Sequence, residues 1–581
     1  MKRCLLILFV YISLFIISIT YSYADLVTVK VDGVSGKIKA NILAFLEISH
    51  QKDSISKERI RALFSKSISQ IKEALKPFGY FRPKIESSLK LLDKKRRIWQ
   101  AYFYINKGER LRISSITFKI VGQGKGEKYF KIKPPFKPGE YFDQNKYEGF
   151  KKSLLDLAYA NGYLDAKFLK KKVLVYLKKN SAQIILIFDT GDRYYFGALS
   201  FKGGHFSKDF LIRFAEFRKG DPFSRKKLLN FRKRLLDSNY FESIDFNLAS
   251  KKTSHLKEIP IDVRIKAKKP NVFRLGIGYV SDVGVRFSMS WNRRYIGRYG
   301  HHLKARLKIS PEESKLTGEY FIPLDRPYSD YLSLKPTIHH YDTDSRLGWK
   351  YAVYFLYSKA LKNGWRRSAG INFGYEDYEV GADNENAKEI VPFLSFEKKV
   401  ADNFLYTNRG YLLQFNFSGE IGGFLAKESY LSSTFKGKYI NRISKDYRLL
   451  TRLNLGVILT EKVRELPASV RFYAGGYSSI RGFSLEELGP TDPYDGETTG
   501  GRYLLVASLE LERHIYKSIS GALFLDFGNS FDPEYKNRIE VGTGFGIRIR
   551  SPLGPIRLDF GFGISKNPVP FKFYLSFGPE F

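Results

Sequence analysis

One arginine, in Ile480-Arg481-Gly482-Phe483, lies where the sequence predicts a charge removed from bulk water. The surrounding stretch, 471–502, contains many glycines, two prolines and several acidic residues, a composition that predicts a long loop. Loops longer than ~12–15 residues without secondary structure of their own are usually functional or disordered. Segments of alternating polarity flank the loop, so we expect it to fold into the lumen of a β-barrel as a tethered plug. A guanidinium in that position must pair with a carboxylate, which is charge pairing rather than catalysis.

The segment Phe524-Leu525-Asp526-Phe527-Gly528 contains the best partner for Arg481. Asp526 is opposite in phase to its apolar neighbours on a predicted strand, so its carboxylate points inward while they face outward. We predict an Arg481–Asp526 pair, with the inward-facing Glu510 as second choice. The predicted strands at 539–549 and 555–563 are expected to line the lumen with glycines and charged residues. A glycine face leaves room for the loop to pack closely against the wall. These residues are Gly542, Gly544, Gly546, Arg548, Arg550, Arg557, Asp559 and Gly561.

The histidines and the glycine-rich motif of the chain do not predict an enzyme. His301-His302 and His339-His340 are adjacent pairs, and neighbours on a strand point to opposite faces, so each pair is a poor metal site. Gly542-Thr543-Gly544-Phe545-Gly546 superficially has the glycines of a nucleotide-binding loop, but it lies within an alternating segment and no helix follows it. We therefore expect no catalytic residue, no metal and no cofactor.

Strands of period two run from Asn271 to the C-terminal end of the sequence and predict an all-β, antiparallel transmembrane barrel. One face of each segment is apolar and the other is polar or glycine, as expected of a wall between lipid and a wet lumen. The count is sixteen, and bacterial barrels have even numbers of strands. The plug loop follows strand eleven and is expected to enter from the extracellular side. The predicted strands are 272–280, 283–291, 301–309, 312–320, 330–340, 346–359, 365–378, 389–397, 411–419, 430–441, 446–459, 502–512, 518–526, 539–549, 555–563 and 571–579.

The first half of the chain repeats with a period near 80 residues and predicts three copies of one α+β module. The marker is an aromatic turn after an amphipathic helix, in which Tyr80, Tyr163 and Tyr240 are spaced 83 and 77 residues apart. Each copy has the pattern strand, helix, helix, strand, strand, which makes a small sheet with helices on one face. The predicted boundaries are 25–109, 110–191 and 192–268 for the modules and 269–581 for the barrel.

The second helix of each module has the clearest sequence signals. Asp143 precedes this helix in the second copy and suits its N-cap. In the third copy we predict helices at 208–217 and 225–237. The apolar stripe of the latter is expected to consist of Leu228, Leu229, Leu235 and Leu236.

The chain begins with the features of an exported protein. Met1-Lys2-Arg3 is followed by the apolar run Leu5–Ile19 and by Ser22-Tyr23-Ala24, a pattern that predicts a secretory signal peptide over 1–24. The only cysteine, Cys4, lies in that segment, so we expect no disulfide and no thiol chemistry in the mature chain.

The charge of the chain is strongly positive, with 98 Lys and Arg against 59 Asp and Glu and a formal net charge of +39. Nucleic acid is a poor explanation for this charge in an exported protein, so we expect no nucleic acid partner. Anionic lipid headgroups, an acidic partner and a solvated lysine-rich surface are the alternatives that the sequence leaves open.

The modules resemble POTRA domains, periplasmic docking modules whose free edge strand can accept an extended segment of another polypeptide. The motifs at 480–483, 524–528 and 544–559 are similar, in type and order, to those of the POTRA-plus-barrel outer-membrane assembly and translocation superfamily. Within it, three modules and the ending Gly578-Pro579-Glu580-Phe581 look most like the TamA type, rather than the BamA type or the two-partner-secretion transporters. The resemblance implies that the barrel lies in the cell outer membrane and the modules in the periplasm.

The resemblance also implies roles for residues of this chain. It implies a loop anchor formed by Arg481, Gly482 and Phe483, and a lumen partner formed by Asp526 and Gly528. Glu510 is added to the lumen partner because of its inward strand phase. The resemblance further implies a barrel wall that includes Gly544, Gly546, Arg548, Arg557 and Asp559. The first and last strands are expected to form a weak seam that opens sideways. The residues that weaken or end it are Gly276, Gly278, Gly578, Pro579 and Phe581.

The function that these features predict is guidance and insertion of client β-barrel or autotransporter-type proteins, through module docking and a lateral seam, without nucleotide hydrolysis. The expected partners are outer-membrane lipid, unfolded client outer-membrane proteins and a TamB-like protein anchored in the inner membrane, and the barrel is expected to be monomeric. The alternatives are a BamA-type general insertase and a two-partner secretion pore. A passive porin or receptor is a further alternative, but it would not need the tandem modules.

Overall fold

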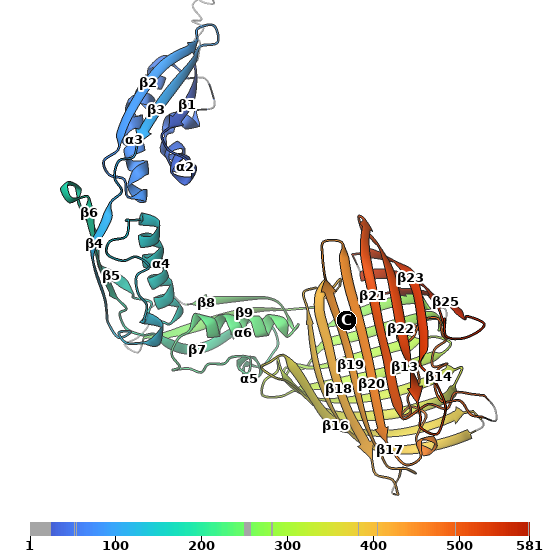
Figure 1. Cartoon of the computed structure of the whole chain (residues 1–581). Helices are drawn as coiled ribbons and strands as arrows, with labels where there is room; N and C mark the ends of the chain where they lie inside the picture. The colour runs from blue at the N-terminus through green and yellow to red at the C-terminus, as the bar shows by residue number, and fades with distance from the viewer. Residues whose placement is uncertain are drawn as a thin grey trace, which may run out of the picture. The chain divides into compact units, whose positions relative to one another are not determined.

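The computed structural model describes residues 25–581 except 52, 54, 249–256, 281, 282, 382, 404, 424, 494, 495, 553, 579 and 581 (Figure 1). The predicted signal peptide, Pro579 and Phe581 therefore lie outside the described residues. The chain divides into two compact units, and the boundary between them runs through the third module. The first unit is Met1–Ala198, Phe217–Lys227 and Ala249–Pro260, and the second is Leu199–Glu216, Leu228–Leu248 and Ile261–Phe581.

The first module is a three-stranded sheet with two helices. Its sheet has the order β1-β3-β2, in which β1 is parallel and β2 antiparallel to the central strand β3. Ile42 of the first helix and Ile60 of the second pack with Phe103 of β3 in one buried core. Among the described helices of the chain, none is both long and apolar enough to cross a membrane. The elements are β1 (Leu26–Asp32), α2 (Gly36–Phe45), α3 (Lys57–Leu75), β2 (Lys84–Asp93) and β3 (Ile98–Asn106).

The second module has the same sheet order but one α-helix where two were predicted. The order is β4-β6-β5, and Asp143 caps α4 as predicted, accepting hydrogen bonds from the backbone N–H groups of Asn145 and Lys146. The predicted first helix is replaced by a single 3-10 turn, Lys128–Phe130, because prolines and glycines before α4 disfavour a helix. The elements are β4 (Arg112–Val121), α4 (Gln144–Ala160), β5 (Lys167–Tyr176) and β6 (Ser181–Asp189).

The third module corrects two details of the prediction. Its first helix, α5, ends at Ile212 instead of 217. Helix α6 has the predicted bounds, but Leu229 and Leu236 are exposed, and Phe231 joins Leu228 and Leu235 in the buried stripe because these three follow the 3.6-residue period. The sheet order is β7-β9-β8. The elements are β7 (Tyr195–Lys202), α5 (Lys208–Ile212), α6 (Arg225–Asp237), β8 (Phe241–Leu248) and β9 (Glu258–Ala267).

The barrel is a closed antiparallel sheet of sixteen strands in sequence order, which confirms the predicted fold class. Each predicted strand corresponds to one observed strand. The largest difference is β17, which has 19 residues because its polar first half extends the ladder where the sequence lacks apolar alternation. The strands are β10 (Asn271–Val280), β11 (Gly284–Ile296), β12 (His301–Ile309), β13 (Glu313–Pro323), β14 (Asp330–Thr343), β15 (Arg346–Ala360), β16 (Trp365–Val380), β17 (Asp383–Ala401), β18 (Arg409–Glu420), β19 (Tyr430–Arg442), β20 (Tyr447–Leu459), β21 (Tyr503–Tyr516), β22 (Ile519–Phe531), β23 (Glu540–Ser551), β24 (Gly554–Phe562) and β25 (Phe571–Phe577).

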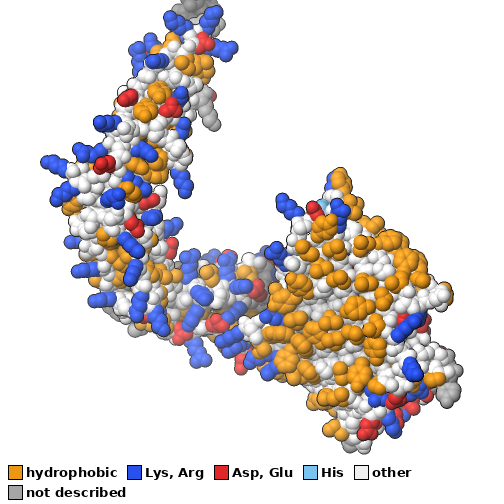
Figure 2. All heavy atoms as spheres, viewed as in Figure 1, with side chains coloured by type: hydrophobic (Ala, Val, Ile, Leu, Met, Phe, Trp, Pro, Cys, Tyr) orange, Lys and Arg blue, Asp and Glu red, His pale blue; other side chains and the backbone are white. Residues whose placement is uncertain are grey.

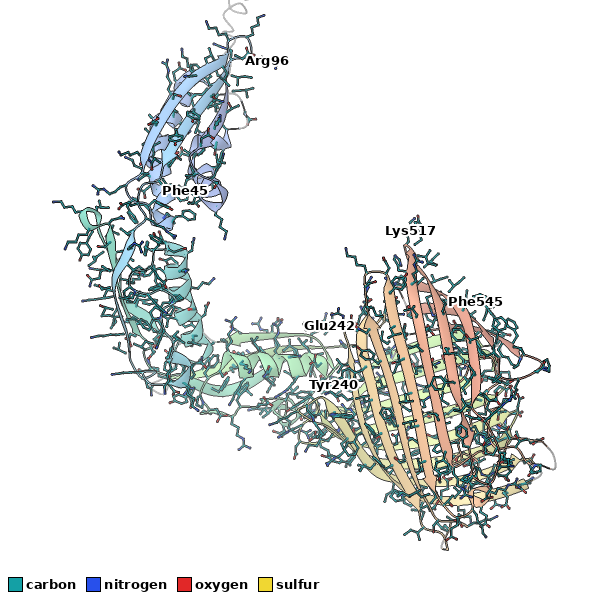
Figure 3. All side chains as sticks on the ribbon, viewed as in Figure 1. Phe45, Arg96, Tyr240, Glu242, Lys517 and Phe545 are labelled. Atoms are coloured by element: carbon teal, nitrogen blue, oxygen red, sulfur yellow. The ribbon has the colours of Figure 1, made fainter. Side chains whose placement is uncertain are left out.

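The outer face of the barrel is apolar. Figure 2 shows hydrophobic side chains gathered over the barrel strands, whereas Lys and Arg side chains are frequent over the N-terminal modules. Leu275 and Ile277 of β10 are among the exposed large hydrophobic residues, and so is Phe545 of β23, which Figure 3 labels. An apolar outer wall and a polar interior are what a barrel needs to lie in lipid.

The connection to the third module shows which turns lie at which end of the barrel. Only three residues separate the end of β9 from the start of β10, so the start of β10 lies at the module end. Within the second unit, the hydroxyl of Tyr240 (Figure 3) donates to the carbonyl oxygen of Gly300, in the β11–β12 turn, at 2.6 Å. Burial raises the pKa of this phenol, which keeps its proton. The β11–β12 turn and every second turn after it therefore lie at the module end, and the loop between β20 and β21 lies at the opposite end.

Candidate functional site

The loop between β20 and β21 is folded on itself and packs inside the barrel. Short antiparallel bridges join Phe472 to Gly501 and Ala474 to Leu488, which give the loop an internal scaffold. Ile480 and Phe483 are fully buried in an apolar cluster with Val506 of β21. This loop, 460–502, is called the plug below.

Arg481 lies at the centre of the plug and its charge is paired with the barrel wall. Its Nε lies 2.7 Å from Oδ2 of Asp526, and its Nη2 lies 3.0 Å from Oδ1 of the same carboxylate. Its Nη1 donates to Glu510 at 2.7 Å, so both carboxylates predicted from the sequence contact one guanidinium. The guanidinium also lies 3.4 Å from the centre of the Phe524 ring. With 2% of Arg481 exposed, this bidentate arrangement is the pairing that a buried arginine needs.

A second buried arginine, Arg548 of β23, completes the charge network. It donates to Glu510 at 2.6 Å and to Asp559 at 2.6 Å, so Glu510 is shared between the two guanidinium groups. Arg481 also lies 3.6 Å from Asp559. Because each member contacts two or more opposite charges, removal of one leaves several buried charges without full compensation.

The glycines of β23 and β24 serve the plug in two different ways. A Cβ at Gly542 would lie 2.0 Å from the carbonyl oxygen of Arg481, and one at Gly561 would lie 2.8 Å from the nitrogen of Gly482, so these two admit the plug backbone. Gly544 and Gly546 do not face the loop as expected. A Cβ at Gly544 would instead lie 2.0 Å from the carbonyl oxygen of Phe560 and 2.5 Å from the Phe524 ring, and one at Gly546 would lie 2.1 Å from the Asp559 carboxylate. They make room for the charge network rather than for the loop.

The plug is also joined to β25, the last strand of the barrel. The hydroxyl of Tyr574 accepts a hydrogen bond from the backbone nitrogen of Gly482 at 3.0 Å and donates to the carbonyl oxygen of Phe483 at 3.2 Å. The hydroxyl groups of Tyr477 and Ser576 lie 2.6 Å apart. Sequence reasoning missed Tyr574, although its inward phase on a strand of outward phenylalanines was a usable signal.

The seam between β10 and β25 is short. Only two residue pairs join the strands, Tyr279 with Leu575 and Val280 with Tyr574. The two flanking ladders are longer, with ten pairs between β10 and β11 and seven between β24 and β25. Gly276 and Gly278 lie on the part of β10 that does not pair with β25, and Gly578 follows the end of β25. The start of β10 is therefore an open sheet edge along this side.

The tail after β25 turns into the lumen instead of following the seam. Glu580 is 6% exposed, and its carboxylate lies 2.9 Å from Arg448 and 3.2 Å from Arg557. Lys438 lies 3.7 Å from the same carboxylate. Arg557 was predicted as a wall residue near the plug, but in the structure it contacts the carboxylate of Glu580 in the tail. Sequence reasoning missed the role of Glu580 because an acidic residue near the end of a chain has no strand phase to place it.

Comparison with known proteins identifies the family. Residues 271–581 match the model described as the Omp85 superfamily domain, which is more than half of the chain. The chain belongs to the Omp85 superfamily. Residues 28–107 match the description "POTRA domain TamA domain 1", and residues 194–268 match a POTRA family described as a surface antigen variable number repeat. This Omp85 protein is therefore an outer-membrane barrel with POTRA domains in the periplasm.

The relatives of this Omp85 chain include outer membrane protein assembly factors. BamA of Nitratidesulfovibrio vulgaris is 22% identical over 497 residues, which are 80% of this chain and 61% of that protein. BamA of Neisseria meningitidis serogroup B is 20% identical over 510 residues, 74% of this chain and 62% of that protein. The crystal structure of BamA from Haemophilus ducreyi lacking POTRA domains 1–3 has the same fold, with a TM-score of 0.67 at 16% identity over 81% of this chain and 99% of that chain. This Omp85 chain spans about three fifths of the length of the curated relatives it matches.

Three other residues singled out in the sequence lie away from the plug anchor of this Omp85 barrel. Gly528 of β22 adopts a φ of 146°, and a Cβ there would lie 1.8 Å from the carbonyl oxygen of Leu505, so it shapes the wall rather than contacting Arg481. The guanidinium of Arg550 lies 4.1 Å from the centre of the Tyr406 ring. Nε2 of His339 lies 3.1 Å from Oε1 of Glu313 on the opposite wall.

The change Gly542→Ala tests whether the Omp85 plug needs a wall residue without a side chain at this position. The added methyl group would lie 2.0 Å from the Arg481 carbonyl oxygen, so the plug must shift, and we expect a loss of about 1–3 kcal/mol. The temperature at which the barrel loses its folded gel mobility should fall by several degrees. Gly318→Ala is the control, because its methyl group would have only Pro336 nearby, at an ordinary 3.5 Å. Equal transition temperatures for the two variants would show that the plug does not rest on Gly542.

Proposed function

We propose that this protein guides client β-barrel or autotransporter-type proteins to the seam of its barrel and releases them into the outer membrane, without nucleotide hydrolysis. The observation that supports this function best is the two-pair junction of β10 and β25 beside an otherwise continuous barrel. Unpaired backbone groups within a bilayer are costly, so an open edge on β10 is a template for an incoming strand.

The free energy for insertion comes from the client itself. A client strand that pairs with β10 satisfies its backbone hydrogen bonds, and its apolar face leaves water for lipid. The edge strands of the three module sheets, such as β2, β5 and β8, offer further backbone groups for docking a client segment on its way to the seam. No step of this sequence requires a catalytic group.

We further assign the protein to the TamA type, with an inner-membrane-anchored TamB-like partner and with outer-membrane lipid around a monomeric barrel. The match of residues 28–107 to TamA domain 1 supports this assignment. A BamA-type general insertase is the second candidate, because BamA proteins are among the relatives of this chain. A two-partner secretion pore differs from both in having a dedicated substrate. Deletion of the gene for a TamB-like protein should reproduce the loss of this protein only if the TamA assignment holds.

A disulfide across the seam tests the proposed function. Tyr279→Cys with Leu575→Cys places two thiols on directly paired residues, and the only native cysteine is Cys4, in the predicted signal peptide. We expect the oxidised variant to lose most of its ability to insert client barrels, because β10 can no longer offer its edge. Appearance of heat-modifiable client barrels in outer-membrane preparations is the measurement.

The matched control places the same Leu575→Cys opposite the other neighbour of β25. Leu558→Cys with Leu575→Cys joins β24 to β25, a ladder that need not open. This variant should insert clients normally when oxidised, and reduction should restore the seam variant. Normal client insertion with the β10–β25 disulfide formed would rule out the lateral seam.

A further inference from the structure

A basic cavity lies in the lumen against the strands that begin the barrel. It has a volume of about 540 Å³ and is lined by residues of β10–β14. Arg274 alternates along β10 with Phe273 and Leu275, whose side chains are exposed on the outer face, so Arg274 is on the lumen face. Six cationic and two acidic side chains line the cavity, a net charge of +4. The cationic ones are Arg274, Lys304, Arg306, Lys308, Lys315 and Lys335, and the acidic ones are Glu313 and Glu319.

The two carboxylates of this basic cavity are already engaged. Glu313 lies 3.1 Å from Lys308 and 3.1 Å from His339, and Glu319 accepts a hydrogen bond from Ser333 at 3.0 Å. Two of the lysines have aromatic contacts, and Lys304 also stands opposite Glu319 in the β12–β13 ladder. Lys304 lies 4.5 Å from the Phe321 ring centre and Lys335 lies 5.3 Å from that of Tyr354.

The remaining cations are less fully compensated, with Glu313 attracting Lys315 from beyond ion-pair distance. In the part of the chain that the structure describes, no carboxylate forms an ion pair with Arg274, Arg306 or Lys315. Lys315 also stands directly opposite Lys308 in the β12–β13 ladder. Like charges at directly opposite positions of an antiparallel pair are destabilising, and an anion between them would remove that repulsion.

On the opposite wall of the lumen, the buried charges are paired. There the plug and the tail form ion pairs with the barrel wall, through Arg481 with Asp526 and Glu580 with Arg448, and Arg548 pairs with Asp559 within the wall. The basic cavity is therefore an open, positively charged surface facing a wall whose charges are already paired. Because it includes Arg274 of β10, it begins directly behind the seam strand.

We infer that this cavity binds acidic segments of a client polypeptide while the client is held at the seam. The inference rests on the proposed function, because it names the part of the client that the lumen receives. A strand that pairs with β10 must keep its polar connecting segment out of the lipid, and the lumen beside β10 is the nearest wet space. A polypeptide suits the cavity better than a lipid, because acyl chains in a polar lumen would be exposed to water.

Binding of an acidic peptide to the full-length protein in uncharged detergent tests the inference. The probe is a short fluorescein-labelled glutamate-rich peptide, and fluorescence anisotropy gives its affinity. The combined change Arg306→Gln and Lys315→Gln should weaken binding by about tenfold at low salt, because two unpaired charges are lost. Arg274→Gln, on a different strand, should weaken it in the same direction. A glutamine-rich peptide of the same length should not bind.

The matched control removes the same charge from the barrel surface. Lys362→Gln with Lys445→Gln changes two exposed lysines in the turns of β15–β16 and β19–β20. The control should bind the acidic peptide as tightly as the unchanged protein, and salt should weaken both equally. All variants should keep the folded gel mobility of the barrel, because Arg306 and Lys315 form no ion pair within the described residues.

Four results would overturn the inference. They are an unchanged affinity in the lumen variants, an equal loss in the surface control, displacement of the peptide by phosphatidylglycerol micelles at equal charge, and displacement by inorganic phosphate at equal concentration. The third result would identify a lipid headgroup site, and the fourth a small-anion site. The peptide-binding assay involves no insertion step, so a negative result would not contradict the proposed seam function. Normal client insertion by the seam-locked variant would contradict the seam function but would not affect the peptide-binding result.

Discussion

Arg481→Ala is expected to release the plug and to abolish most client insertion. Arg481 is 2% exposed and its guanidinium contacts Asp526 and Glu510, so its loss leaves buried carboxylates without their partner. Breaking a buried pair by removing one member typically costs about 3–5 kcal/mol. The plug also holds β25 through Tyr574, so its release should disturb the seam as well. We would measure the transition temperature of the folded barrel by gel mobility, and function by the appearance of client barrels.

A double-mutant cycle with Asp526→Ala tests whether Arg481 and Asp526 act as one unit. Each single change should impair function strongly, and the double change should be no worse than either, because residues that act as a unit are not additive. Arg513→Ala is the control, since this arginine lies on the neighbouring strand β21 but is exposed. If both single changes are silent, Arg481 is an ordinary loop arginine, and the case for an assembly factor rests on the POTRA modules and the family match alone.

The barrel and the plug anchor could be predicted from the sequence because local sequence patterns indicate both. Alternating polarity marks each wall strand, and the inward phase of Asp526 and Glu510 indicated two partners of the loop arginine. The bidentate geometry and the sharing of Glu510 with Arg548 could not be predicted, because they depend on how the plug packs against β21, β22 and β23, between residues 29 to 45 positions apart. The partial pairing of the seam has the same origin, since its strands stand at the two ends of the barrel sequence.

The errors in the modules arise from weaker local signals. The predicted first helix of the second module is replaced by a 3-10 turn, and α5 is shorter than predicted. Both segments are first helices, which the sequence places only by analogy with the neighbouring copies. The exposed Leu229 shows a further limit, because two adjacent leucines on a helix cannot both lie on one narrow buried stripe.

Glu580 is expected to hold the seam short by drawing the tail of β25 into the lumen. Its carboxylate lies among Arg448, Arg557 and Lys438, so Glu580→Ala removes the charge that keeps the tail there. The register of the seam would then place Ser576 opposite Gly278 and Phe577 opposite Ile277 as the next pairs. We therefore expect the variant to extend the β10–β25 ladder and to lose client insertion, although the barrel still folds.

Disulfide formation between Ile277→Cys and Phe577→Cys measures that extension. In the unchanged background these thiols are not on paired residues, and oxidation should be slow. With Glu580→Ala, the two positions come into register, and oxidation should become about tenfold faster, because breaking a buried ion pair of several kcal/mol releases the tail. Glu461→Ala, an exposed carboxylate in the plug, should leave the oxidation rate unchanged. Equal rates with and without Glu580 would show that other contacts, such as Tyr477 with Ser576, are sufficient to hold the tail and that its charge has no part in keeping the seam open.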